Sequence, residues 1–226
     1  MIEKIVIFDF DGTLLQTFYG DDNSYIKALS HFLPLDLNYK YWQDCYHLTD
    51  SAVLDHIYRK IENRSPYDWE VEKIKEKFLE IMFQKSQIHP HFFEEIPGAS
   101  LLLQALLQKE NAKVGVATGG WKSLAEFKLK HLNVPLNQLY IKGSDHHFSK
   151  FDFTQNLIEE IKTKEKVMEN VSITYIGDSL YDFEMAEKAG FNFIGIDFKR
   201  AGTFEKLKLK HVLNDFTDLD FIHNLI

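Results

Sequence analysis

The sequence predicts an α/β fold in which a doubly wound parallel sheet carries an inserted, all-helical domain. Short apolar runs rich in Val, Ile, Phe and Tyr alternate with longer amphipathic stretches along most of the chain, which is typical of parallel strands connected by helices. One stretch near the amino terminus breaks this alternation, because its pattern is helical throughout and it contains no strand-like run.

The strands are expected to be buried on both faces of the sheet, because apolar residues occupy both alternations of each run. The expected strands are Ile5–Phe8, Lys113–Ala117, Leu139–Ile141, Ser172–Ile176 and Phe191–Ile196, with a short edge strand at His211–Leu213. The expected helices are Ala99–Gln108, Lys122–His131, Phe153–Ile161, Tyr181–Ala189 and Phe216–Ile226. This order of elements predicts a Rossmann-like sheet with helices on both faces.

The stretch that breaks the alternation predicts a separate helical domain. Helices are expected at Ser24–Leu29, at Ser51–Ile61 and from Pro66 to Met82, and the apolar residues of the second share one helical face. About 78 residues are too many for a loop within a compact domain. We therefore predict two domains, which are a core of residues 1–15 and 94–226 and a helical domain of residues 16–93.

The composition is that of a soluble globular protein and excludes several classes of function. The 226 residues include 34 acidic and 26 basic ones, a formal net charge of −8, whereas a nucleic-acid-binding protein normally presents a basic face. No apolar run approaches the roughly 20 residues of a membrane-spanning helix. The amino terminus does not resemble a signal peptide, and the single cysteine, Cys45, fits a reducing compartment. We therefore expect a cytoplasmic protein that binds neither nucleic acid nor membranes.

Two aspartates directly follow the first predicted strand, in the sequence Asp9-Phe10-Asp11-Gly12-Thr13. Carboxylates at i and i+2 can face one site if the chain turns between them, and Gly12 permits such a turn. Ligands of open α/β sheets bind at the carboxyl ends of the strands, which is where these aspartates lie. The alternative, a solvated turn, is disfavoured by the apolar strand before it.

Two further predicted strands end in residues suited to phosphate and metal binding. Thr118-Gly119-Gly120 precedes a helix, where a hydroxyl and glycine N–H groups can hold a phosphate, although this tripeptide also forms ordinary turns. Asp178 ends a later strand, and Asp182 lies one turn into the next helix; Asp178 could also cap that helix, and the helix dipole would favour Asp182 in its first turn. Together with Asp9 and Asp11 these carboxylates would repel one another without a cation, and their oxygens suit Mg²⁺.

These motifs resemble those of the haloacid dehalogenase superfamily of phosphohydrolases, in order and spacing, along nearly the whole chain. Asp9-Phe10-Asp11-Gly12-Thr13 is similar to the first motif, Thr118 to the second, and Gly177-Asp178 with Asp182 to the fourth. The third motif is a lysine, for which Lys150 is better placed than Lys142. The long gap between the first two motifs resembles members with an inserted helical cap, such as phosphoglycolate phosphatase and β-phosphoglucomutase.

The resemblance implies a Mg²⁺-dependent phosphatase that hydrolyses a small-molecule phosphomonoester. Asp9 would attack phosphorus and form an aspartyl-phosphate, and Asp11 would act as the general acid and base. The implied metal site comprises the side chains of Asp9 and Asp178 and the backbone carbonyl of Asp11, while Asp182 would orient metal-bound water or the active-site lysine. The implied phosphate-binding residues are Thr118, Gly119 and Lys150.

By the same resemblance, substrate specificity is expected to come from the helical cap. Candidate residues are Tyr19, Thr49, Asp50 and Arg59. If Thr49 or Asp50 has a single role, that role is expected to be the N-cap of the following helix. Asp11 favours phosphate-ester transfer, because dehalogenating relatives lack an aspartate at its position. Two alternatives stay open, a phosphomutase that uses a bisphosphate activator and a non-catalytic phosphate-binding domain. The oligomeric state stays open as well.

Overall fold

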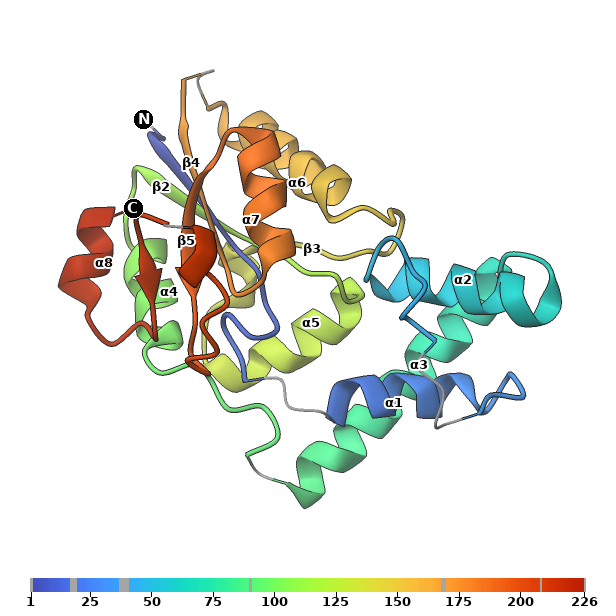
Figure 1. The fold of residues 1–226 in the computed structure, drawn as a ribbon. Coiled ribbons are helices and arrows are strands. Elements are labelled where there is room, and N and C mark those ends of the chain that lie inside the picture. The colour runs from blue at the N-terminus through green and yellow to red at the C-terminus, as the bar shows by residue number, and fades with distance from the viewer. Residues whose placement is uncertain are drawn as a thin grey trace.

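The computed structural model describes residues 2–16, 20–36, 41–89, 91–167, 170–207 and 209–225. Six strands within these ranges form one parallel sheet in the order β3-β2-β1-β4-β5-β6 (Figure 1). The strands are β1 (Lys4–Phe8), β2 (Ala112–Ala117), β3 (Tyr140–Lys142), β4 (Ser172–Gly177), β5 (Asn192–Ile196) and β6 (Val212–Leu213). Helices flank this sheet, so the predicted α/β fold is confirmed.

The central position of β1 follows from its sequence, since residues 5–8 are apolar and fully buried. This strand pairs with β2 on one side and with β4 on the other, and Phe8 lies beside both Val116 and Ile176. The segments that follow these three strands therefore leave the sheet side by side. They are the segments in which three of the sequence motifs lie.

Two layers of helices cover the sheet, as the alternation along β1 requires. Ile5 and Ile7 pack against Phe153 and other apolar residues of α6 (Lys150–Glu165) and α7 (Leu180–Ala189). Val6 and Phe8 belong to the opposite core, which includes α4 (Ala99–Leu107), α5 (Lys122–Leu129) and α8 (Leu219–Leu225). The short 3₁₀ turns in the described ranges are η1 (Lys130–Leu132), η2 (Leu136–Gln138) and η3 (Glu205–Leu207).

Two of the helices that flank the sheet begin three residues away from their predicted starts. α6 begins at Lys150 rather than Phe153, because Ser149 is extended while its carbonyl already accepts hydrogen bonds from the first turn. α8 begins at Leu219 rather than Phe216. The reason is that the Phe216 N–H donates to the Pro97 carbonyl. In addition, the N–H and hydroxyl of Thr217 donate to the Asp215 carboxylate, which holds this segment in a turn.

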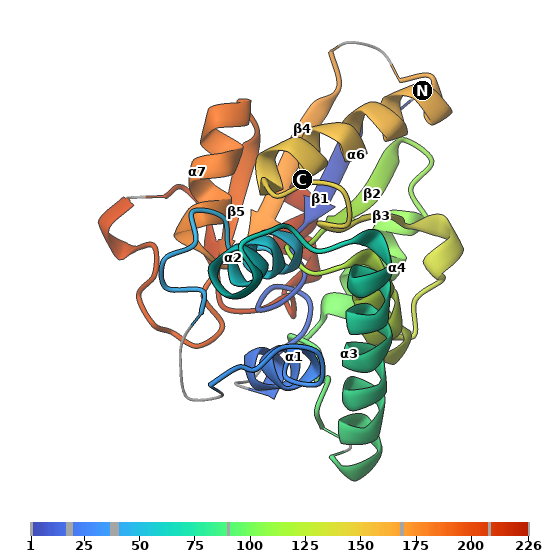
Figure 2. The same ribbon diagram turned by 90° about the vertical axis from the view of Figure 1, so that its right-hand side faces the viewer.

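Three helices lie together beside the sheet, namely α1 (Gly20–Leu29), α2 (Asp50–Glu62) and α3 (Asp68–Ile88) (Figures 1 and 2). α2 buries the predicted apolar face, and α1 packs against α3. The chain enters and leaves this segment at one place, since Leu15 bridges to Glu95 and the Ile96 N–H donates to the Leu14 carbonyl at 2.9 Å. Across the described ranges, no helix is both long and apolar enough to cross a membrane.

Trp121, in the loop between β2 and α5, joins the helical segment to the sheet. Its indole is fully buried beside the rings of Tyr25 and Phe78, with centroids 5.6 and 6.4 Å away. The indole N–H donates to the Ser51 hydroxyl at 2.8 Å, and the backbone N–H donates to the Asp50 carboxylate at 3.0 Å. A side chain from the loop after β2 is thus part of the core of the helical segment.

Candidate active site

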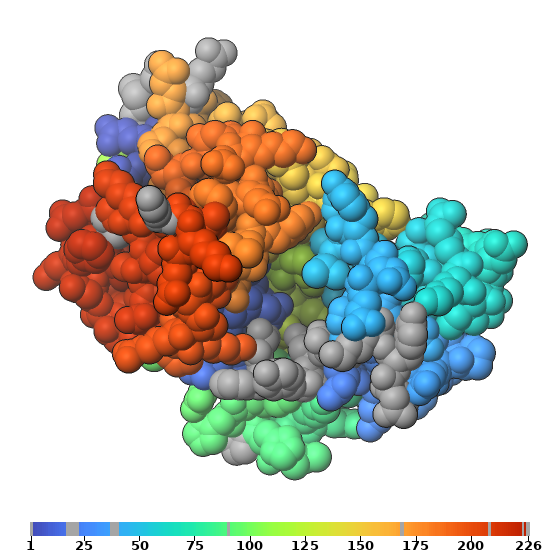
Figure 3. Space-filling view, viewed as in Figure 1, coloured from blue at the N-terminus to red at the C-terminus, as the bar shows by residue number. Residues whose placement is uncertain are grey.

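A cavity of about 740 Å³ lies between the carboxyl ends of the strands and the helical segment. In the space-filling view, the chain just before α2 (light blue) reaches toward the β4–α7 region (orange), with the amino-terminal segment (dark blue) visible between them (Figure 3). The wall of the cavity at the strand ends includes Asp9, Asp11, Thr118, Gly119, Lys150 and Asp178. Its other wall includes Tyr25, Trp42, Leu48, Thr49, Val53 and Phe78. The predicted catalytic residues therefore share one cavity.

Asp9 and Asp11 are placed by the turn that follows β1. Asp9 extends the strand, since its N–H donates to the Ile176 carbonyl at 2.8 Å, and its side chain is buried. Gly12 then turns the chain with φ +88°, a conformation that favours glycine. A Cβ at Gly12 would collide with the Asp178 carboxylate, so the glycine also lets the two strand ends approach each other.

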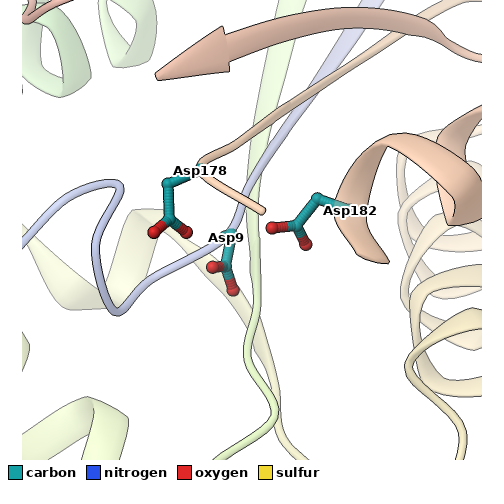
Figure 4. A group of neighbouring side chains, drawn as sticks. All are labelled: Asp9, Asp178 and Asp182. Atoms are coloured by element: carbon teal, nitrogen blue, oxygen red, sulfur yellow. The ribbon is translucent and has the colours of Figure 1, made fainter. Parts of the chain in front are cut away.

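Asp178 and Asp182 are placed by the turn between β4 and α7. The Ser179 hydroxyl caps α7 by accepting from the Asp182 N–H, and the Asp182 carboxylate accepts from the Ser179 N–H and hydroxyl in return. The carboxylates of Asp9, Asp178 and Asp182 lie close together (Figure 4), with one oxygen of each within 4.8 Å of the others. Asp182, which completes the capping box of α7, is therefore also a member of the carboxylate cluster.

Lys150 is the lysine that the structure brings to this cluster. Its ammonium lies 2.6 Å from Asp9 Oδ1 and 2.7 Å from Asp182 Oδ1, and the side chain is buried. The position follows from α6, whose first residue is Lys150. The alternative lysine, Lys142, instead lies 3.5 Å from the Glu160 carboxylate on α6.

Burial and neighbouring charges shift the pKa values of the groups in this cluster. Burial, and next the negative charge of Asp182, raise the pKa of Asp178 to about 6. Burial also raises the pKa of Asp9 well above its ordinary range, although the Lys150 ammonium opposes this shift. The pKa of Lys150 is raised by Asp182 and Asp9 in spite of its burial. Carboxylates that are costly to ionise together are a donor set that fits a hard divalent cation such as Mg²⁺.

The loop after β2 lies at the same strand ends. Thr118 is buried, its N–H donates to the Lys142 carbonyl, and its hydroxyl oxygen accepts from the Gly120 N–H at 3.1 Å. The Gly119 carbonyl accepts from the Asp50 N–H, so this loop contacts the start of α2. Thr118 and Gly119 both line the cavity, where their polar groups can face a phosphate.

The residues expected to contact a substrate's leaving group are placed in different surroundings. Thr49 is the N-cap of α2, where its hydroxyl accepts from the Ala52 N–H, and it lines the cavity together with Asp50. Arg59 does not line the cavity, because it lies on the outer face of α2 with its side chain 64% exposed and 2.6 Å from the Asp55 carboxylate. Tyr19 lies outside the described residues.

Lys128 on α5 is a cavity residue to which no sequence motif pointed. Its side chain is buried, and its ammonium lies 2.9 Å from Asp11 Oδ1. Leu124 and Ala125 line the cavity from the same face of α5. The carboxylate partner of Lys128 is 117 positions away in the chain, so no local pattern could identify the pair. The local signal for Lys128 was its place as a lysine on an otherwise apolar helix face.

Comparison with known proteins agrees with this geometry. A family model of haloacid dehalogenase-like hydrolases matches residues 6–196. No curated protein matches the chain. Among solved structures, a hydrolase from Pseudomonas syringae is 24% identical, with a TM-score of 0.63 and 99% of both chains covered. A predicted phosphoglycolate phosphatase from Haemophilus somnus is 17% identical, with a TM-score of 0.63 and 98% of both chains covered.

A third structure, a predicted β-phosphoglucomutase from Bacteroides vulgatus, is 15% identical and has a TM-score of 0.61. The match covers 99% of this chain and 88% of that one. At these identities the three structures establish a shared fold.

Proposed function

Because this chain belongs to the haloacid dehalogenase-like hydrolase family, we propose that it is a Mg²⁺-dependent phosphatase acting on a small-molecule phosphomonoester. The observation that carries this proposal is the cluster of Asp9, Asp178 and Asp182 around Lys150 at one end of the cavity. In this proposal residues 16–93 form a cap that covers the site and selects the substrate.

In the first step, an oxygen of the Asp9 carboxylate attacks phosphorus and the bond from phosphorus to the ester oxygen breaks. Asp11 donates a proton to that oxygen, so the alcohol leaves neutral and Asp9 carries the phosphoryl group. The 2.6 Å contact between Lys150 and Asp9 Oδ1 supports this assignment, because it fixes the orientation of the attacking carboxylate.

In the second step, water attacks the phosphorus of the aspartyl-phosphate while Asp11 accepts one of its protons. The bond between phosphorus and the Asp9 oxygen breaks, which releases inorganic phosphate and restores both aspartates. The buried Thr118 hydroxyl and the backbone of Gly119 face the phosphoryl oxygens, which keeps them oriented in both steps.

The metal would be held by the side chains of Asp9 and Asp178 and by the Asp11 backbone carbonyl. When bound, it supplies positive charge that offsets the repulsion between the Asp9 carboxylate and the phosphate dianion. We assign Asp182 to holding Lys150, because one Asp182 oxygen lies 2.7 Å from the ammonium and the other accepts two hydrogen bonds from Ser179.

Phosphate release from a panel of phosphomonoesters, with and without Mg²⁺, tests the proposal. The native chain is expected to release phosphate only with the metal, and Asp9→Asn to release none. Equal release by both proteins would contradict Asp9 as the nucleophile. Isomerisation of a phosphorylated substrate that needs a bisphosphate activator and releases no phosphate would identify a phosphomutase instead.

A matched pair of variants tests the assignment of the lysine. Lys150→Met is expected to lose nearly all turnover, whereas Lys142→Met keeps it because that side chain lies beside Glu160. Loss of turnover in Lys142→Met with retention in Lys150→Met would reverse the assignment.

A further inference from the structure

A second buried lysine stands at the second aspartate of the first motif. Lys128 is 4% exposed, and its ammonium lies 2.9 Å from Asp11 Oδ1 and 5.7 Å from the centre of the Phe10 ring. Two lysines of the cavity wall therefore serve different carboxylates, with Lys150 at Asp9 and Lys128 at Asp11. The ion pair with Asp11 offsets the cost of burying this ammonium and places a positive charge beside the reacting groups.

The contact with Asp11 assigns Lys128 to the alcohol side of the proposed reaction. Lys150, Thr118 and Gly119 already supply donors on the side where the phosphate binds in the proposed mechanism. The same cavity is also lined by apolar and aromatic residues, among them Leu124 on α5 and Phe78 on α3. Because Lys128 contacts Asp11, which protonates the ester oxygen in the proposed mechanism, its ammonium would lie near the alcohol of a bound ester.

We propose that Lys128 makes this chain selective for phosphate esters whose alcohol carries a second anionic group close to the ester oxygen. The inference rests on the proposed function, because it takes the ester oxygen to lie at Asp11. An atom in contact with Asp11 Oδ1 is also near an ammonium that lies 2.9 Å from that oxygen. An ammonium has three N–H donors, so Lys128 can hold Asp11 and an anionic oxygen of the substrate together.

A neutral alcohol group would bind the Lys128 ammonium more weakly than an anionic group. Hydrogen bonds between a lysine and a charged oxygen are about twice as strong as those between neutral groups, and the apolar wall keeps the contact away from water. The competing explanation is that Lys128 only positions Asp11. That role would affect all esters alike, whereas a substrate contact affects the anionic ones.

Racemic 2-phosphoglycerate and glycerol 2-phosphate form a suitable pair of probes, because they differ only by a carboxylate in place of a hydroxymethyl group. Their affinities are measured by calorimetry with Mg²⁺ and full-length Asp9→Asn, which lacks the nucleophile and should therefore leave the esters uncleaved. We expect 2-phosphoglycerate to bind about 10- to 100-fold more tightly, the range for one hydrogen bond to a charged group.

Variants of Lys128 then decide between the two explanations. Lys128→Gln removes the charge but keeps N–H donors for Asp11, and it is expected to bring the affinity ratio close to one. Lys128→Arg keeps the charge and is expected to keep most of the difference in affinity between the two esters. Lys130→Gln, at an exposed lysine in η1 two residues further along the chain, is expected to leave the ratio unchanged. Thermal unfolding of each protein confirms that it is folded.

Equal affinity for the two esters, or a preference that survives Lys128→Gln, would overturn the inference. Phosphate release from glycerol 2-phosphate and the wider panel by the native chain reports on the proposed function separately. A chain that binds the anionic ester through Lys128 but releases no phosphate would contradict the phosphatase and support the anion contact.

Discussion

The two walls of the cavity hold their side chains in different ways. On the strand-end wall, short turns after β1 and β4 fix charged groups such as Asp9 and Asp178 within a few ångströms of one another. On the facing wall, Tyr25 and Phe78 are held by packing around Trp121, and the surface is mostly aromatic and aliphatic. The chemistry thus depends on local backbone geometry, whereas the shape of the space for the alcohol depends on how helices pack.

Among variants that keep Asp9 and Lys150, the largest effect is expected at the strand-end wall, from Asp11→Asn. The amide cannot transfer a proton to the leaving alcohol, so kcat for an alkyl phosphate is expected to fall by about 10²–10⁴. Nitrophenolate leaves without a proton, so its release in the first step should slow much less, although the second step still needs Asp11 as the base. Single-turnover kinetics with both esters measures the first step, and near-normal hydrolysis of the alkyl phosphate by Asp11→Asn would refute the acid–base role.

Gly12→Ala tests whether the backbone turn sets the carboxylate geometry. The new Cβ would meet the Asp178 carboxylate, and displacing reacting groups by about 1 Å can cost about 100-fold in rate. Gly190→Ala is a matched control, because that glycine also has a positive φ but a Cβ there meets nothing within 4 Å. Both variants lose some stability from backbone strain, and only Gly12→Ala is expected to lose turnover.

Metal affinity is expected to follow the charge of Asp178. Since burial and Asp182 raise its pKa from 3.8 to about 6, the folded chain holds a proton there that the unfolded chain releases near pH 4. Without metal, the free energy of unfolding therefore falls as the pH rises from 4 to 6, and this loss persists above pH 6.

Mg²⁺ competes with that proton, so its affinity should weaken by about tenfold between pH 7.5 and pH 5. Thermal unfolding with and without Mg²⁺ at the two pH values measures the effect, and Asp178→Asn should remove it. A larger stabilisation by Mg²⁺ at pH 5 than at pH 7.5 would contradict the assignment.

The smallest effect is expected from Arg59→Ala on the helical segment. The side chain is exposed and paired with Asp55 one turn away, so the free energy of unfolding should change by less than about 0.5 kcal/mol. KM and kcat should stay within about twofold of the native values, because the side chain does not line the cavity. A large rise in KM would mean that α2 rearranges when substrate binds.

Sequence alone predicts best what lies close together in the chain. Asp9 and Gly12 form a local motif after a buried strand, and the parallel order of strands is enough to bring Asp178 beside them. The choice between Lys150 and Lys142 needs the direction of each side chain, which spacing alone does not give. Lys128 meets its partner only because α5 lies beside the turn that follows β1, so nothing local identifies the pair.

The buried position of Trp121 limits how freely the two parts of the molecule could be exchanged. The chain enters and leaves the helical segment at neighbouring residues, Leu15 and Glu95, so a segment of another length could join the sheet at little entropic cost. A foreign segment would nevertheless leave the indole without Tyr25, Phe78 and its hydrogen bond to Ser51. A working chimera therefore needs a graft in two pieces, the helices together with the loop that carries Trp121.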